Sequence, residues 1–386
     1  MNLTAGYNFL RIIKNIGLAL VAILLLAGIG GALIGYLISA PISHNEETRA
    51  ERAAPFQEGR FVNFEPQAGT EITLAAIIEA LSDHERTSPT GEIPVVSIDP
   101  SLLDGPPEDG LRMAWLGHAG VLIEIDGKRV LTDPVLSDRA SPTSYVGPKR
   151  FHPSPIDLQK LRNVDAVVIS HNHYDHLDQA TIRHLSKQET QFFVPLGNKA
   201  QLLAWDIPDA QITELDWWEE ATVNGLRIVS TPSRHYSNRG TFDYKKTLWS
   251  SWSIVGPTNR VFVSGDTGYA KVFSEIGTRL GPFDATVIKV GAYGPGDAWH
   301  DIHMTPEQAV QVHLDVKGGH MLPVHWGTFN LAYHPWDEPI IRTQTSAAQK
   351  NIVLATPKVG EFFDVHLDNE FPNWWEEVEQ GVNTDD

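Results

Sequence analysis

Metal-capable side chains are concentrated in residues 170–178, a loop with the pattern H-x-H-x-D-H that follows a largely apolar run. His171 and His173 stand two apart on extended backbone and therefore project to the same side. Asp175 and His176 fall on the turn where a helix is expected to begin. An isolated pair of histidines would usually belong to an ordinary polar loop, but this density of candidate ligands indicates metal binding. We therefore expect a fold in which one strand end supplies ligands to two neighbouring metal ions.

Further candidate ligands follow three other strand-like segments. His235, Asp266 and His325 each come at or just past a short apolar run. Taken alone, a histidine at a strand end is more often a hydrogen-bonded structural residue. In open α/β sheets, however, functional side chains gather where buried strands end. Together with the loop, these three residues predict a centre for two metal ions.

Several sequence blocks are more specific than the loop itself. They comprise residues 131–134, 146–151, 170–178, 264–269 and 325–329. Through these blocks the chain resembles the metallo-β-lactamase superfamily and, within it, the N-acylphosphatidylethanolamine-hydrolysing phospholipase D family. The similarity extends from about Leu111 to about Glu361. The loop alone would indicate only the superfamily, which also contains lactamases, thioesterases, lactonases and nucleases.

The resemblance implies a complete set of metal ligands. A first zinc would be bound by His171, His173 and His235, a second by Asp175, His176 and His325, and Asp266 would bridge the two. Imidazole and carboxylate ligands suit zinc, and the chain has no cysteine to offer a thiolate. Iron or manganese is an alternative, because the same ligand set binds either. The resemblance further implies that a water bound to both ions acts as a hydroxide nucleophile.

Two more residues match functional positions of the family. Asp133, at the end of a predicted strand, resembles the carboxylate that orients the nucleophilic water or a ligand histidine. His303 resembles the group that stabilises the phosphoryl oxygen or protonates the leaving alkoxide. The alternative for His303 is a structural role before the helix that is expected to begin at Thr305. His118 is expected behind the ligands or in a tight turn.

The resemblance implies an enzyme that cleaves a phosphodiester bond of glycerophospholipids. The reaction would be of phospholipase D type, with substrates like N-acylphosphatidylethanolamine. A lactonase or another carbonyl-ester hydrolase is the first alternative, because the same nucleophile attacks a carbonyl carbon. A non-catalytic metal-binding module of the cell envelope is the second, but the complete ligand set argues against it.

The pattern from Leu111 onward alternates short apolar strands with helices. Strands are expected at 112–116, 120–125, 129–133, 165–170, 191–195, 226–231, 248–255, 260–264, 285–290 and 320–324. Helices are expected at 177–187, 198–205, 269–278, 305–316 and 338–349. This α/β pattern is consistent with the αββα sandwich that the resemblance implies.

The N-terminal region has a different character. Residues 16–38 contain no charged side chain, and at about 1.5 Å per residue a helix of this length would exceed a hydrocarbon core of roughly 30 Å. We expect a transmembrane helix here, with a cleaved signal peptide as the alternative. Arg11 and Lys14 precede it, so residues 1–15 should be cytoplasmic. The expected location is the inner membrane, single-pass, with the catalytic domain on the periplasmic or extracytoplasmic side.

Three segments follow the expected helix. Residues 39–108 are expected to form a stalk that partly wraps the catalytic domain, with Phe61 in the part that docks. The catalytic domain should span 109–367. The acidic tail 368–386 has one apolar anchor, Trp374-Trp375, and is expected to fray beyond it.

Charge limits the partners. The formal net charge is −18, and no extended basic cluster is present that could neutralise several phosphates of a nucleic acid. We therefore expect no nucleic acid as a partner. The resemblance implies a phospholipid substrate, and the apolar N-terminal segment predicts a membrane partner. Lys149 and Arg150 could contact a single phosphate or form an ordinary solvated pair. The sequence leaves the oligomeric state open, with a dimer as one alternative.

Overall fold

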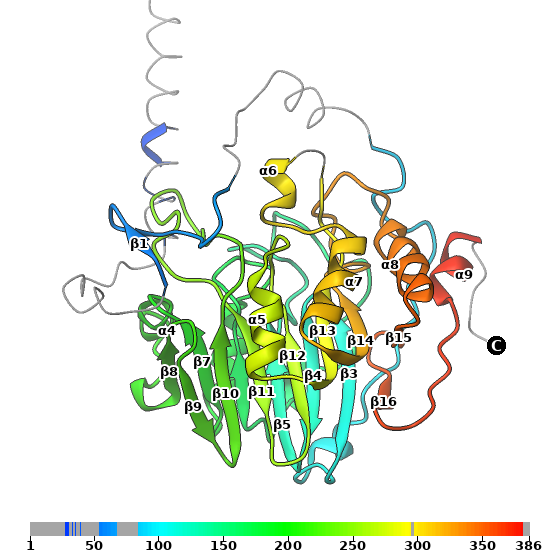
Figure 1. Ribbon diagram of the computed structural model, residues 1–386. Helices are drawn as coiled ribbons and strands as arrows, with labels where there is room; N and C mark the ends of the chain where they lie inside the picture. Colours follow the sequence, from blue (N-terminus) through cyan, green and yellow to red (C-terminus); the bar gives the residue numbers. More distant parts are fainter. Residues whose placement is uncertain are drawn as a thin grey trace, which may run out of the picture.

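The computed structural model describes residues 28–30, 33, 35, 39, 54–67, 84–294 and 297–380. Two seven-stranded sheets form the centre of the catalytic domain (Figure 1). The first sheet has the spatial order β16 (Phe362–Asp364), β3 (Leu111–Gly117), β4 (Gly120–Ile125), β5 (Lys128–Thr132), β6 (Ala166–Val168), β7 (Gln191–Pro195) and β8 (Ile212–Leu215). The second has the order β15 (Val353–Leu354), β14 (Gly318–Val324), β13 (Phe283–Lys289), β12 (Arg260–Val263), β11 (Ser251–Val255), β10 (Leu226–Thr231) and β9 (Glu220–Val223).

The two sheets repeat one pattern of strand directions. In the first, the pairs from β16 to β5 are antiparallel and those from β5 to β8 are parallel. In the second, the pairs from β9 to β12 are antiparallel and those from β12 to β15 are parallel. The chain therefore contains two similar halves, which the sequence alone did not reveal.

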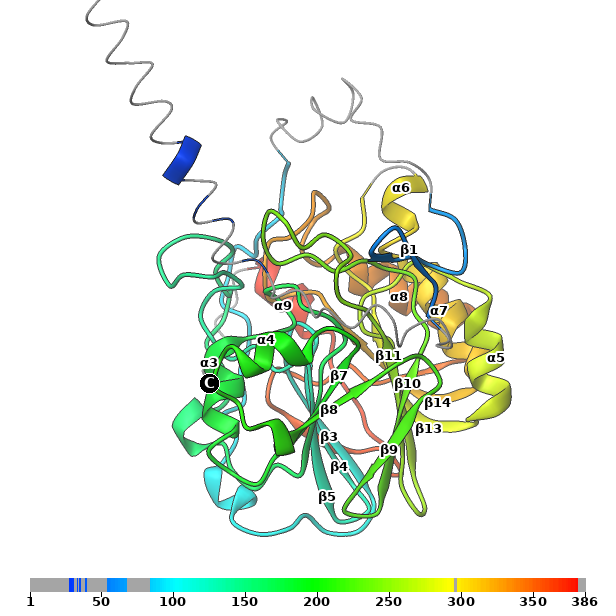
Figure 2. The ribbon, with the colours of Figure 1, turned by 90° about the vertical axis from the view of Figure 1, so that its left-hand side faces the viewer.

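Helices cover the outer faces of both sheets, which gives four layers when the molecule is viewed from the side (Figure 2). On the first sheet lie α3 (Gln179–Leu185) and α4 (Lys199–Leu203), and on the second lie α5 (Val272–Arg279), α7 (Pro306–Asp315) and α8 (Glu338–Gln349). Shorter elements are the hairpin β1 (Phe56–Gln57) and β2 (Arg60–Phe61), the 3₁₀ turns η1 (Pro100–Leu103), η2 (Leu158–Lys160) and η3 (Asp209–Gln211), and the helices α6 (Asp297–His300) and α9 (Trp374–Gln380). The expected α/β metallo-β-lactamase architecture is confirmed.

Two apolar cores hold the layers together. Between the sheets, Val168 of the first packs in the same cluster as Trp252 of the second. A second cluster lies between the first sheet and its helices, where Val167 meets Ile182 of α3. Neighbouring residues of one strand thus enter different cores, as the period-two alternation of strands requires. Both faces of β6 are buried, which explains its uninterrupted apolar sequence.

The candidate ligands lie directly after the C-terminal ends of several strands. Asp133 follows β5, the ligand loop follows β6, and Asp266 follows β12. Helix α7 begins just beyond these strand ends, and its start is fixed by a capping box between Thr305 and Gln308. These strand ends bring the candidate ligands close to one another.

No helix in the described part of the chain combines the length and apolar content that a membrane crossing requires. The expected single-pass placement in the inner membrane, with an extracytoplasmic catalytic domain, is therefore wrong. Most of the expected span 16–38, and all of residues 1–15, lie outside the described residues.

The described end of that segment contacts the folded domain. Gly35 is buried, and a side chain at this position would collide with Thr241. The backbone N–H of Phe242 donates to Ser39 Oγ at 3.2 Å. The apolar pattern of the sequence cannot distinguish a helix surrounded by lipid from one whose end packs against a protein loop.

The C-terminal region is more ordered than expected. Trp374 and Trp375 are buried, as an anchor should be. Beyond them the chain continues as α9 to Gln380, so the expectation of fraying directly after the pair is wrong. Residues 381–386 lie outside the described residues. The boundaries at 108/109 and 367/368 stay predictions.

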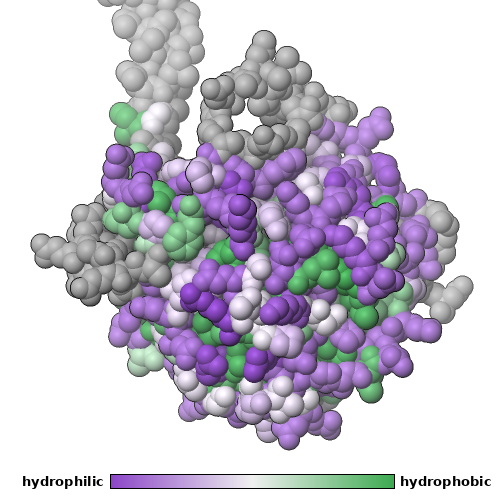
Figure 3. All heavy atoms as spheres, in the orientation of Figure 1, coloured by the Kyte–Doolittle hydropathy of each residue, from purple (hydrophilic) through white to green (hydrophobic). Residues whose placement is uncertain are grey.

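The surface is largely hydrophilic on the face shown in Figure 3, with apolar side chains in small separate areas. This distribution agrees with the acidic composition.

Candidate metal centre

The ligand loop leaves β6 and turns back on itself before α3. The backbone N–H groups of His176 and Leu177 both donate to the His173 carbonyl, at 3.1 and 2.9 Å. Asp178 ends the loop as the N-cap of α3, and its carboxylate accepts from Ser137 and Thr181. This turn directs the histidines and Asp175 to one side of the loop.

The first ligand group consists of His171, His173 and His235. His171 Nε2 and His235 Nε2 lie 2.7 and 3.5 Å from His173 Nδ1. Burial lowers the pKa of His173 to about 4, so this imidazole is neutral at pH 7 and has a lone pair for a metal. The structure therefore places the three residues of the expected first zinc site together.

The second ligand group consists of Asp175, His176 and His325. The Nε2 atoms of both histidines lie 3.4 Å from Asp175 Oδ2. His118 also reaches this group, with Nε2 2.9 Å from the same Oδ2. Burial lowers the pKa of His118 to about 3, so its ring is neutral and can support Asp175 by a hydrogen bond. His118 thus contacts Asp175, and its ring nitrogen lies in one cluster with Asp175, His176 and His325.

Asp266 lies between the two groups. Its Oδ1 is 3.1 Å from His325 Nε2. Its Oδ2 is 3.4 Å from His176 Nε2 and 3.8 Å from His235 Nε2. Burial alone would raise the pKa of Asp266, but the neighbouring charges of His325 and His176 hold it well below its usual range. The carboxylate is therefore ionised and positioned to bridge two cations.

The residues fit a metal centre on a further observation. His176 Nε2, His325 Nε2 and Asp266 Oδ1 are buried and have no hydrogen-bond partner among the described residues. Unpaired buried polar atoms cost about 1–3 kcal/mol each unless a ligand satisfies them. Three such atoms converging from separate elements are what a bound cation would satisfy.

Asp133 is positioned behind a ligand rather than toward the centre. Its Oδ2 accepts from His176 Nδ1 at 2.8 Å and from Ser170 Oγ at 2.6 Å. With Nδ1 protonated, His176 presents the Nε2 lone pair to the metal. Of the two roles expected for Asp133, the geometry favours orienting a ligand histidine. Its backbone φ of 36° is unusual for a residue other than glycine and shows how tightly this turn is constrained.

His303 lies at the edge of the centre beside Lys289, a residue that sequence analysis did not identify. His303 Nδ1 is 3.7 Å from Asp266 Oδ2 and contacts Lys289 Nζ directly. Lys289 is buried at the end of β13, and burial lowers its pKa to about 8. A lysine that interrupts the apolar run of a buried strand was the signal that could have found it.

Asn63 is a second residue that sequence analysis missed. Its side chain donates to the His235 carbonyl at 2.9 Å and accepts from the His235 N–H at 3.1 Å. Gln67 Nε2 donates to the same carbonyl at 3.3 Å. The segment 54–67 thus reaches the first ligand group, and its Phe61 is buried.

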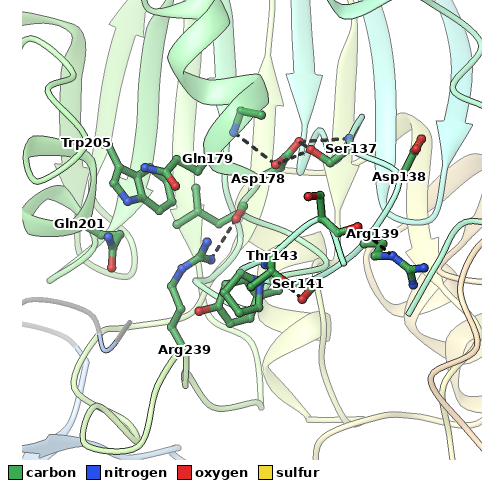
Figure 4. A pocket seen from close by; sticks show the side chains of 15 residues that line it. Ser137, Asp138, Arg139, Ser141, Thr143, Asp178, Gln179, Gln201, Trp205 and Arg239 are labelled. Atoms are coloured by element: carbon green, nitrogen blue, oxygen red, sulfur yellow. Dashed lines mark hydrogen bonds between the residues drawn. The ribbon is translucent and has the colours of Figure 1, made fainter. Parts of the chain in front are cut away.

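A pocket of about 550 Å³ lies beside the ligand loop (Figure 4). Arg239 is buried in its wall and donates through Nη1 to the carbonyls of Asn172 and Leu177, both at 2.9 Å. Its guanidinium lies over the Tyr174 ring, 4.0 Å from the centroid. Burial lowers the pKa of Arg239 to about 10, so it stays charged at neutral pH and joins both ends of the loop.

Lys149 and Arg150, the pair considered as a phosphate contact, have different surroundings in the structure. Arg150 is buried and donates to the carbonyls of Val135 and Leu116, at 2.6 and 2.7 Å. It therefore supports the turns next to Asp133 and is neither a phosphate contact nor a solvated residue. Lys149 is exposed.

The fold and the site define a metal-dependent hydrolase of the metallo-β-lactamase type. Residues 128–326 match the family model described as a beta-lactamase superfamily domain. The chain belongs to the metallo-β-lactamase superfamily and, within it, to the N-acylphosphatidylethanolamine-hydrolysing phospholipase D-like family. The resemblance inferred from the sequence is confirmed.

Three comparisons illustrate this membership. An uncharacterised protein of Mycobacterium tuberculosis is 45% identical over 336 residues, which cover 84% of this chain and 88% of that protein. The N-acyl-phosphatidylethanolamine-hydrolyzing phospholipase D 1 of Caenorhabditis elegans is 41% identical over 232 residues, covering 58% of this chain and 65% of the nematode protein. The crystal structure of a possible metal-dependent hydrolase from Veillonella parvula shares the fold, with a TM-score of 0.53, 19% identity, and coverage of 66% of this chain and 99% of that one.

Proposed function

We propose that the protein is a dinuclear zinc phosphodiesterase that cleaves glycerophospholipids in the manner of a phospholipase D. The substrate class is N-acylphosphatidylethanolamine-like lipids, by analogy with the nematode relative. A water oxygen joins the phosphorus, the bond from phosphorus to the head-group oxygen breaks, and phosphatidic acid and an alcohol result. Two zinc ions, when bound, supply Lewis acidity toward the phosphate oxygens and acidify a water.

The observation that carries this proposal is the meeting of two ligand groups at one carboxylate. Asp266 contacts His325 and His176 of one group and His235 of the other. A single structural ion would need only one such group, whereas a pair of sites joined by a carboxylate suits displacement at phosphorus, where attacking and leaving oxygens both need stabilising.

His303 is assigned to the leaving group. The Lys289 ammonium has only donors to offer, so His303 Nδ1 accepts and the ring proton resides on Nε2. Burial and the Lys289 charge hold the pKa of the His303 imidazolium well below its ordinary value, so the ring is neutral at pH 7 and keeps its Nε2 proton as a hydrogen-bond donor. His303 Nε2 can then donate to the departing head-group oxygen.

Hydrolysis in ¹⁸O-labelled water tests the bond that is cleaved. Purified zinc-loaded protein is incubated with N-acylphosphatidylethanolamine in mixed micelles, and the isotope content of the products is measured by mass spectrometry. We expect the label in phosphatidic acid and an unlabelled alcohol. Label in the alcohol, or in a fatty acid, would contradict the proposal.

A panel of lactones and carbonyl esters under the same conditions tests the alternative chemistry. Turnover of lactones without any lipid cleavage would favour a carbonyl hydrolase. Metal content is measured in parallel, and about two metals per chain are expected, with fewer in His171→Ala and Asp266→Ala. Two bound metals without hydrolysis of either panel would favour a non-catalytic metal-binding module.

A further inference from the structure

Five buried tryptophans form one stack beneath the turn that carries His325. We call this set the tryptophan stack, and Trp326 is at its centre. The other rings lie around it at centroid distances of 5.4 Å for Trp115, 5.2 Å for Trp374, 6.3 Å for Trp336 and 5.8 Å for Trp375. None of the five is more than 4% exposed. Aromatic pairs at such distances contribute beyond their buried area.

The stack is joined to the second ligand group through one carbonyl. The Trp115 indole N–H donates to the His118 carbonyl at 2.9 Å. The backbone N–H of His325 donates to the same oxygen, also at 2.9 Å. The ring of His118 lies 3.9 Å from that of His325, and its Nε2 reaches Asp175. The position of the stack therefore determines where His325 and, through His118, Asp175 lie.

The backbone of His325 needs such support. Its φ of 67° is in the left-handed region, which is unfavourable for a residue other than glycine. A conformation of this kind persists when the surroundings determine it. Trp326 is the next residue along the chain, so packing of its ring fixes the turn immediately after the ligand.

Helix α9 closes the stack from outside. Trp374 and Trp375 are its first residues. Their indole N–H groups have no hydrogen-bond partner among the described residues, so ring packing positions them. Later in the helix, Glu379 accepts from the Trp336 indole and lies 3.5 Å from Arg86 Nε. Helix α9, which is distant in the sequence from His325, thus packs on one side of the tryptophan stack behind the turn that carries His325.

We propose that α9 is a positioning element for the second metal. Through Trp374 it fixes Trp326, and through Trp326 it keeps His325 in the geometry that a metal requires. The first ligand group takes no residue from the elements that form the stack. This inference rests on the metal assignment proposed above. Loss of Trp374 should therefore weaken the second ion selectively.

Stepwise metal titration tests the selectivity in the full-length protein. Metal-free wild type, Trp374→Ala and Phe283→Ala are titrated with Co²⁺ against a competing chelator, and absorption bands report each ion. Phe283 is the matched control, because it is equally buried but begins β13 at the end away from Lys289. We expect Trp374→Ala to lose about tenfold or more in affinity for the second ion, with little change for the first, as is typical when groups behind metal ligands are removed.

Two outcomes overturn the inference, and they can be told apart. If Trp374→Ala binds both ions as tightly as Phe283→Ala does, α9 is only a part of the core. If wild type itself takes up no second ion, the dinuclear assignment has failed as well. Should Trp374→Ala not fold, Trp374→Phe keeps a ring in the stack and is measured in the same way, with a smaller but still selective loss expected.

Discussion

His303 and Lys289 show how one contact sets the chemistry of a side chain. The buried ammonium directs its donors at Nδ1, and the ring is thereby kept in the tautomer that has a proton on Nε2. The sequence identified His303 only through a family resemblance. It did not identify the partner Lys289, whose only local signal is a charge within the largely apolar second half of a buried strand.

Replacing His303 should separate metal binding from catalysis. We expect His303→Ala to lower turnover by roughly a hundredfold or more, the usual loss when one hydrogen-bond donor to developing charge is removed from a reaction centre. Metal content should stay at the wild-type value. The control is His300→Ala, which removes the same side chain from the end of α6. Equal turnover in His303→Ala and wild type would return His303 to a structural role.

The raised pKa of His176 leads us to expect that metal binding depends on pH. Burial alone would lower its pKa, but the carboxylates of Asp266, Asp175 and Asp133 raise it well above 6.5. The raised pKa means that the proton stabilises the metal-free fold at low pH, and that this contribution is lost as the pH rises through that pKa. A metal must displace this proton, so affinity should increase with pH.

Calorimetric titration with zinc at pH 7 in two buffers of different ionisation enthalpy measures this proton. We expect release of about one proton or more per second ion bound. A binding heat that does not depend on the buffer would mean that His176 is already neutral.

At the scale of elements, the strands and helices with strong apolar periodicity were all predicted. The sequence missed β8, β9, β15 and β16, which are short strands at the edges of the two sheets. It also missed α9, because the acidic residues after Trp375 resemble a solvated tail. For β8 and α9 a partner more distant in the sequence supplies the stabilisation, and a local pattern cannot show it. Strand β9 instead pairs with β10 across the two-residue turn Asn224-Gly225, a local hairpin signal that was overlooked.

The segment 54–67 is predicted to support the first ligand group. Asn63→Ala removes both hydrogen bonds to the His235 backbone and a third to the Trp249 indole. We expect affinity for the first ion to fall about tenfold, with a smaller change for the second. Gln57→Ala, an exposed amide of the same segment, is the control. The same Co²⁺ titration distinguishes the two ions, and unchanged affinity in Asn63→Ala would limit this segment to packing.

At the scale of the whole molecule, the two halves meet at the centre. Loop residues of the first half and strand-end residues of the second contribute to both ligand groups. The sequence predicted most of this set, because the ligands follow recognisable strands. It did not predict the location of the N-terminal segment, because apolar composition alone does not define the surroundings of a helix.

Removing the metals should lower stability without unfolding the protein at room temperature. Ions present at about a thousand times their dissociation constant stabilise the native state by roughly 4 kcal/mol. For a chain of this size that corresponds to a decrease in Tm of roughly 5 °C after chelation. Scanning calorimetry with and without chelator measures it, and far-ultraviolet circular dichroism at 25 °C should be unchanged, because both apolar cores are independent of the ions. A variant lacking the bridge, Asp266→Ala, should respond less to the chelator.

The distribution of ligands also has a consequence for biosynthesis. The second group takes Asp175 and His176 from the first half of the chain and His325 from near the end of the second. A ribosome-bound chain therefore cannot complete this group until almost the whole domain has been translated. The proposed second ion can therefore be bound only by chains that have been translated almost to the end of the domain.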